Sequence, residues 1–102
     1  MSKRGSQELR IADVATFLAV VRHGSVTGAA RELRVTPSQV SKAVARIERF
    51  LRRPLLSRKS RGVVLDEDAA DLLPRMRDLL ERARVLQLHD SKPERVLTVA
   101  AT

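Results

Sequence analysis

The chain has 102 residues, a formal net charge of +8, only 2% aromatic residues and no cysteine. This length suits one small domain with an appendage, and the lack of cysteine excludes disulfides and thiolate metal sites. The sequence has no apolar run of about 18 residues that could span a membrane and no secretory signal, so we expect a cytoplasmic protein without metal or cofactor.

The positive charge is concentrated in the first two thirds of the chain. Residues 1–65 contain 14 Lys and Arg against 4 Asp and Glu, whereas residues 66–102 contain 6 against 8. A basic head followed by a slightly acidic tail is typical of a protein that binds a polyanion such as nucleic acid. A basic surface that is merely solvated would give the same counts.

Two helices are expected at the start of the chain, after a disordered N-terminus over residues 1–9. Apolar residues at helical spacing predict the first helix over residues 11–23, and Gly24 supplies its C-terminal stop. Ser25 is a capping residue for a second, short helix that ends near residue 33. The apolar stripe of the first helix consists of Val14, Phe17, Leu18 and Val21.

A third helix is predicted from Thr36 to about Leu51. Thr36 stands at the cap, Pro37 at the first helical position and Gln39 three residues after the cap, which together form a strong start signal. The outer face of this helix is polar and basic and comprises Ser38, Gln39, Ser41, Lys42, Ala45, Arg46 and Arg49. The two arginines could instead lie on a solvated face, paired with Glu32 or Glu48.

Two short strand patterns, over residues 55–58 and 63–65, flank the turn sequence 59–62 and predict a β-hairpin with cations near its tip. We therefore expect a mainly α fold: a winged helix-turn-helix over residues 10–65, with three helices and a hairpin wing. The major groove of double-stranded DNA admits one α-helix, and wing cations can reach phosphates. The expected DNA-binding residues are Ser25, Thr27, Thr36, Pro37, Ser38, Gln39, Ser41, Lys42, Arg46, Arg58, Lys59 and Arg61.

A long final helix is expected over residues 66–89, capped by Asp66 and kinked at Pro74. It carries a heptad pattern that predicts dimerisation, although the same residues could form intramolecular core. The expected dimerisation residues are Ala69, Leu72, Met76, Leu79, Ala83 and Leu86. Residues 90–102 are expected to form a hinge and, over residues 96–100, a strand.

These stretches resemble the DNA-binding domain of LysR-type transcriptional regulators over residues 14–75. The resemblance rests on collinear motifs without gaps, although Pro37-Ser38 stand where the family often has Gln-Pro. The matching motifs are residues 17–25, Ala29-Ala30 with Leu33, residues 35–42, Ile47-Glu48, residues 55–58, and Arg61 with Leu65.

The resemblance implies a sequence-specific regulator of transcription that binds DNA as a homodimer, often as a tetramer. It implies an operator that is an imperfect inverted repeat of the T-N11-A type, an effector-binding domain that begins with the strand at residues 96–100, and scope for contact with RNA polymerase. Two other functions fit the residues less well: a scaffold built on the heptad helix, and a nonspecific nucleoid protein. No nucleophile–base pair or phosphate loop is present, so an enzyme is not expected.

Overall fold

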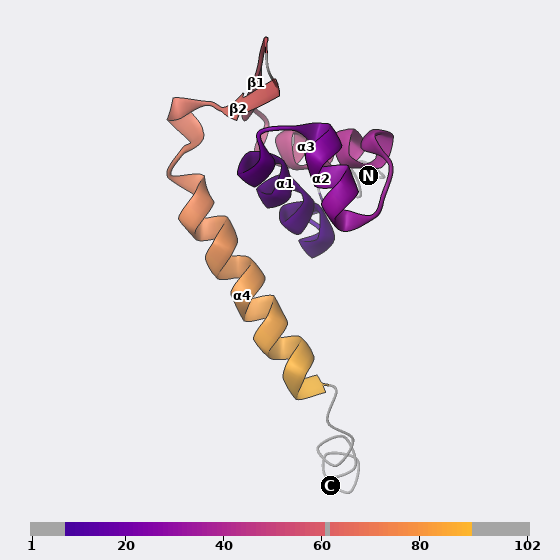
Figure 1. Ribbon diagram of the computed structural model, residues 1–102. Helices are drawn as coiled ribbons and strands as arrows, with labels where there is room; N and C mark the ends of the chain where they lie inside the picture. Colours follow the sequence, from indigo (N-terminus) through magenta and orange to yellow (C-terminus); the bar gives the residue numbers. More distant parts are fainter. Residues whose placement is uncertain (1–7, 61, 91–102) are drawn as a thin grey trace, which may run out of the picture.

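The computed structural model describes residues 8–60 and 62–90. Three helices form a head, a two-stranded hairpin lies at its edge, and the longest helix runs past the head and beyond it (Figure 1). This is the predicted mainly α, winged helix-turn-helix architecture with a long helix. The elements in chain order are α1 (Ile11–His23), α2 (Val26–Leu33), α3 (Pro37–Leu51), β1 (Leu56–Lys59), β2 (Gly62–Leu65), the short 3-10 helix η2 (Glu67–Ala69) and α4 (Leu72–Asp90).

Local signals set the helix ends as expected. Gly24 adopts a left-handed conformation (φ 67°) and donates its N–H to the carbonyl of Val20, which ends α1. The Ser25 hydroxyl accepts the N–H of Gly28 at 2.8 Å and thereby caps α2. These short-range contacts satisfy backbone groups that a helix end leaves without partners, so the positions of the turns follow from the sequence.

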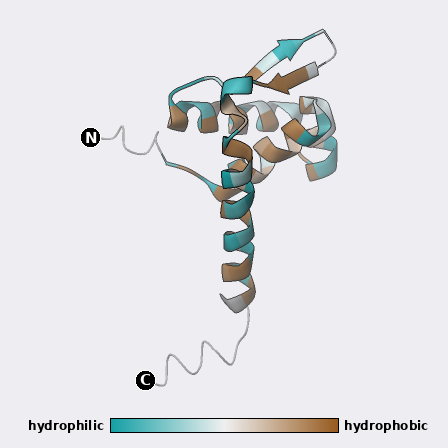
Figure 2. Cartoon of the chain, turned by 90° about the vertical axis from the view of Figure 1, so that its left-hand side faces the viewer, coloured by the Kyte–Doolittle hydropathy of each residue, from teal (hydrophilic) through white to brown (hydrophobic). Residues whose placement is uncertain are grey.

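The core of the head is aliphatic except for Phe17. Phe17 of α1, Ile47 of α3 and Leu55 before the hairpin are all fully buried or nearly so. Hydrophobic and hydrophilic positions alternate along each helix of the head (Figure 2), and α1 packs against α2, α3 and α4. Burial of these apolar side chains is the main favourable contribution to folding.

One charged side chain is buried in this core. Asp13 of α1 is only 4% exposed, and its two carboxylate oxygens accept hydrogen bonds from Arg46 of α3, at 2.8 Å from Nε and 3.0 Å from Nη2. The bidentate contact raises the pKa of the Arg46 guanidinium. A two-point contact between planar groups fixes orientation as well as distance, so it sets how α3 lies across α1.

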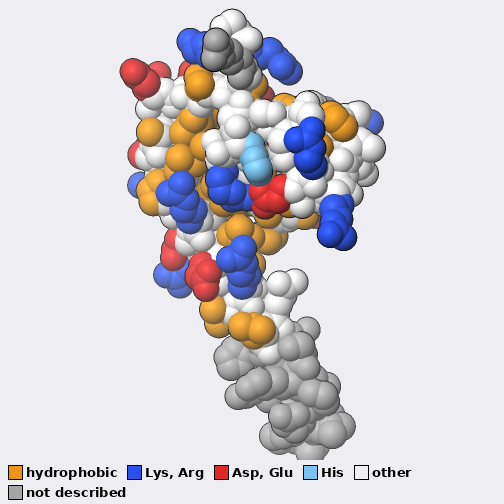
Figure 3. Space-filling model, in the orientation of Figure 1, with side chains coloured by type: hydrophobic (Ala, Val, Ile, Leu, Met, Phe, Trp, Pro, Cys, Tyr) orange, Lys and Arg blue, Asp and Glu red, His pale blue; other side chains and the backbone are white. Residues whose placement is uncertain are grey.

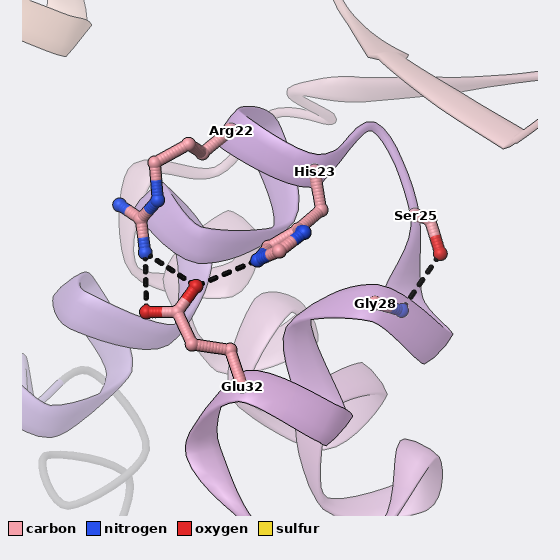
Figure 4. A network of polar contacts seen from close by, with 5 residues as sticks. All are labelled: Arg22, His23, Ser25, Gly28 and Glu32. Carbon is pink, nitrogen blue, oxygen red and sulfur yellow. Dashed lines mark hydrogen bonds and ion pairs between the residues drawn. The ribbon is translucent and has the colours of Figure 1, made fainter.

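A second ionic contact joins α1 to α2 on the surface (Figure 4). Arg22 and His23, at the end of α1, both point to the carboxylate of Glu32 on α2, at 2.7 Å and 2.6 Å. The Arg22 guanidinium, and after it the His23 ring, hold the pKa of the Glu32 carboxyl below its ordinary value of 4.5. Glu32 is therefore not the partner of Arg46 or Arg49 that the sequence suggested.

The hairpin is attached to the head at two points. The Glu48 carboxylate of α3 accepts the backbone N–H groups of Leu55, at 2.7 Å, and Leu56, at 3.3 Å. The N–H of Val63 donates to the carbonyl of Gly24 in the turn between α1 and α2. Glu48 thus holds the hairpin and is not the ion-pair partner of a surface arginine that the sequence suggested.

Gly62 is required where the hairpin meets that turn. Its φ of 134° is one that side chains rarely allow, and an added Cβ would lie only 2.2 Å from the Gly24 carbonyl oxygen. The strands pair antiparallel, with Leu56 opposite Leu65 and Lys59 opposite Gly62. The close backbone approach therefore fixes where the wing lies on the head.

The start of the long helix differs from the prediction. Asp66 precedes η2 and makes no capping hydrogen bond; its carboxylate accepts the hydroxyl of Ser57 at 2.9 Å. The helix itself begins at Leu72, so Pro74 lies in its first turn. A proline there removes an N–H that has no intrahelical partner. The structure thus corrects two predictions: residues 66–71 do not belong to the long helix, and Pro74 does not produce an interior kink.

The predicted heptad residues divide between two environments. Ala69 and Met76 are buried in the core of the head, with Leu72 and Leu79 packed partly buried against it. Ala83 is half-buried, and Leu86 is 70% exposed. The first part of the pattern thus packs on the chain's own head. The expected strand at residues 96–100 lies outside the described residues, and in the part that is described no helix is long and apolar enough to cross a membrane.

The loss of Asp13 and the loss of Arg46 should lower the stability of the fold by different amounts. Arg46→Ala leaves a buried carboxylate without its partner, whereas Asp13→Ala leaves an arginine whose side chain is already one third exposed and can turn to water. We expect Arg46→Ala to lower the free energy of unfolding by about 2 to 4 kcal/mol and Asp13→Ala by about half as much. Urea unfolding measures both, and an equal or smaller cost for Arg46→Ala would contradict this account.

The Glu32 contact should depend on pH. Since the pKa of Glu32 is lower in the folded chain, its carboxylate stabilises the fold above pH 4.5, and this contribution is lost as the pH falls through the lowered pKa. Glu32→Gln should lower Tm at pH 7, and its Tm should converge with that of the parent as the pH falls below the lowered pKa of Glu32. Glu81→Gln, at the exposed 3.5 Å pair with Arg84, is the matched control. If the Tm difference between Glu32→Gln and the parent persisted unchanged in acid, the Glu32 carboxylate would not be its source.

Candidate nucleic-acid interface

The start of α3 is an exposed, polar and fully capped helix terminus. The Thr36 hydroxyl accepts the N–H of Gln39 at 3.1 Å, and the Gln39 side chain accepts the N–H of Thr36 at 2.9 Å. Pro37 occupies the first helical position, and the first turn holds no acidic residue. The helix dipole adds partial positive charge here, so this terminus is suited to approach an anion.

Most of the predicted DNA-binding residues on α3 lie on this surface. The side chains of Thr36, Pro37, Ser38 and Gln39 are exposed, and so are those of Ser41 and Lys42 in the next turn. Hydroxyl, amide and ammonium groups can all donate hydrogen bonds to base edges or phosphates. The recognition surface, by which we mean residues 36–42 of α3 apart from buried Val40, is therefore continuous.

Arg46 was also predicted to bind DNA, but its side chain is engaged in an ion pair within the fold. Its guanidinium is held by Asp13 and contributes to the packing of α3. The contact of Asp13 with Arg46 was not predicted from the sequence, because the two residues are 33 positions apart. The one available signal was a carboxylate beside the apolar stripe of α1, which calls for a buried partner.

The start of α2 lies beside the recognition surface. Thr27 is exposed, whereas Ser25 is half-buried and its hydroxyl is occupied by the capping bond to Gly28 (Figure 4). An added Cβ at Gly28 would lie 3.1 Å from the His23 side chain. The turn is therefore tightly packed, and of these predicted residues only Thr27 presents an unburied side chain.

The wing meets the middle of α3. Arg58 and Lys59 of β1 are exposed. Arg58 and Ser41 line one shallow hollow together with Val26 of α2, Ala45 of α3 and Val63 of β2. The structure thus brings one predicted wing residue and one predicted helix residue together. Arg61 lies outside the described residues.

Charged and apolar side chains are interspersed on the surface. Lys and Arg side chains gather around the head and beside the wing, and apolar side chains are exposed near the end of α4 (Figure 3). The exposed large apolar residues there are Val85, Leu86 and Leu88. The ion pairs Arg82–Asp78 and Arg84–Glu81 lie on the same stretch of the helix. Leu86 follows Leu79 at heptad spacing, so it continues beyond the head the apolar stripe by which α4 packs on the head.

Comparison with known proteins identifies this arrangement. The model of the family described as bacterial regulatory helix-turn-helix protein, lysR family, matches residues 11–70. The chain is 36% identical over 72 residues to a probable HTH-type transcriptional regulator, LtrA, of Klebsiella pneumoniae, covering 71% of this chain and 23% of LtrA. It is 42% identical over 66 residues to the HTH-type transcriptional activator AmpR of Citrobacter freundii, covering 65% and 23%. The chain thus spans about a quarter of the length of these relatives.

Solved structures agree with this assignment. Full-length CbnR complexed with its target DNA superposes with a TM-score of 0.73 and 26% identity, covering 79% of this chain and 28% of that one. The BenM_DBD chain in complex with catB site 1 DNA has the same fold, with a TM-score of 0.72, 24% identity, and coverage of 81% and 92%. The family and these relatives are transcriptional regulators and not enzymes. The chain belongs to the LysR family of bacterial helix-turn-helix regulators.

Proposed function

We propose that this chain reads double-stranded DNA by placing the start of α3 in the major groove. The observation that carries the proposal is the recognition surface: a capped helix start, exposed on all its polar residues, with no acidic residue in its first turn. A major groove accommodates one helix, and small side chains allow close approach to the base edges. The similarity to CbnR, solved with its target DNA, supports the proposal.

The predicted contacts divide into two roles. Ser38, Ser41 and Lys42 are placed to reach base edges from α3, and Thr36 and Pro37 to set how closely the helix approaches. Thr27 at the start of α2, with Arg58 and Lys59 on the wing, is placed to contact phosphates on either side. Phosphate contacts orient the protein, and base contacts select the sequence.

We also propose that the regulator dimerises through α4. Leu86 is 70% exposed and follows Leu79 at heptad spacing, so it continues past the head the apolar stripe by which α4 packs on the head. Because Ala69, Leu72, Met76 and Leu79 already contact the head, the end of α4 is the part left to meet a second copy. A two-fold dimer reads an inverted repeat, which agrees with the T-N11-A operator that the family resemblance implies. Such a regulator would act on chromosomal DNA in the cytoplasm.

Selection of bound sequences from a random double-stranded DNA pool near physiological salt tests the DNA-reading proposal. We expect an enriched inverted repeat with fixed spacing. Lys42→Ala should then lower affinity for the selected sequence by about 1 to 3 kcal/mol and relax the preference at one position of each half-site. Lys59→Ala, the control on the wing, should weaken binding to selected and random DNA alike. A pool without enrichment would overturn the proposal, and equal losses on both DNAs for Lys42→Ala would overturn its base-reading role.

The dimer proposal is tested at the exposed end of α4. Leu86→Asp places a charge at the exposed end of this apolar stripe, and we expect it to convert a dimer into a monomer in sedimentation experiments. Gln87→Asp, at the neighbouring exposed position, is the matched control and should remain dimeric. If Leu86→Asp sediments as the parent does, dimerisation occurs elsewhere.

A further inference from the structure

The side-chain carbonyl of Gln39 is fully occupied within the chain. Its Oε1 accepts the backbone N–H of Thr36 at 2.9 Å and the Thr36 hydroxyl at 3.2 Å. A backbone N–H can only donate, so the oxygen of the amide, and not its nitrogen, must face Thr36. A carbonyl oxygen has two lone pairs, and here both are used.

The nitrogen of the Gln39 amide is in a different situation from its oxygen. Gln39 is exposed in the first turn of α3, in the middle of the recognition surface. Among the described residues, no hydrogen-bond partner is found for its Nε2 group. That group carries two N–H donors and no acceptor. The residue therefore offers hydrogen-bond donors alone to anything that approaches this turn.

We propose that Gln39 is a specificity-determining residue that reads DNA as a donor only, an inference that rests on the proposed DNA-reading function. Glutamine usually pairs with adenine through two bonds, accepting from N6 and donating to N7. The capping box removes the acceptor needed for this pairing. Gln39 instead favours keto bases: guanine offers two acceptors, N7 and O6, and thymine offers O4, whereas adenine presents the N6 donor beside its N7 acceptor and cytosine presents the N4 donor.

One substitution removes the N–H donor of Gln39 and keeps the helix cap. Gln39→Glu keeps an oxygen for the Thr36 N–H, and Glu is a normal capping-box residue at this position, but the variant has no N–H to offer. We expect its Tm to match that of the parent. Gln39→Ala removes both the donor and the cap, so it should lose the same base preference and also melt at a lower temperature.

The test is selection from a random double-stranded DNA pool with the parent and both variants, scored as base preference at each position and not as total affinity. The parent should show guanine or thymine at one position of each half-site. Both variants should lose that preference by roughly five- to tenfold while the rest of the repeat is retained. A switch to cytosine with Gln39→Glu, where the carboxylate accepts from N4, supports the same contact.

Two results overturn the inference and leave the proposed function intact. One is a repeat that Gln39→Glu recovers unchanged. The other is a parent preference for adenine or cytosine at the position that the variants alter. Failure of the proposed function is distinguishable, because the parent itself would then enrich no sequence.

Discussion

The fold depends on one buried carboxylate. Asp13 lies 4% exposed at the start of α1, where an unpaired charge would be costly, and Arg46 neutralises it through two hydrogen bonds from the middle of α3. Apolar packing restricts how the helices cross, and the bidentate ionic contact adds a directional constraint on the orientation of α3 relative to α1. The Asp13–Arg46 pair therefore orients α3 so that Val40, Val44 and Ile47 face the core and the capped start of the helix faces outward.

The position of the wing also depends on α3. Glu48 lies two residues after Arg46 and binds the backbone at the start of the hairpin. The orientation of α3 therefore determines where β1 lies. The Gly24 carbonyl then binds Val63 of β2 from the other side. Because both contacts are made to backbone groups, they place the strands whatever their exposed side chains are. Arg58 and Ser41 consequently line one hollow, so helix and wing form a single surface, which is the one that we propose contacts DNA.

Short-range signals made much of this predictable. Gly24, Ser25 and the Thr36–Gln39 box each act within a few residues, and the helix ends appear where these signals place them. The pairing of Asp13 with Arg46 could not be predicted from the sequence, because only the tertiary fold brings these two residues together. Pro74 was misjudged because a heptad pattern does not reveal where a helix begins. That pattern was also ambiguous in principle, since the same apolar spacing suits packing on the chain's own head, as at Met76, and packing on a second chain.

We infer that α3 and the wing face DNA while the Asp13–Arg46 pair holds them from behind. Backbone amide chemical shifts, measured by NMR with and without a selected operator duplex, would show which residues DNA affects. We expect the largest changes at residues 36–42 and at Arg58 and Lys59, with the Arg46 side-chain Nε–H signal unchanged because its bond to Asp13 persists. Large changes confined to α4, or a strong shift of the Arg46 signal, would disprove this arrangement.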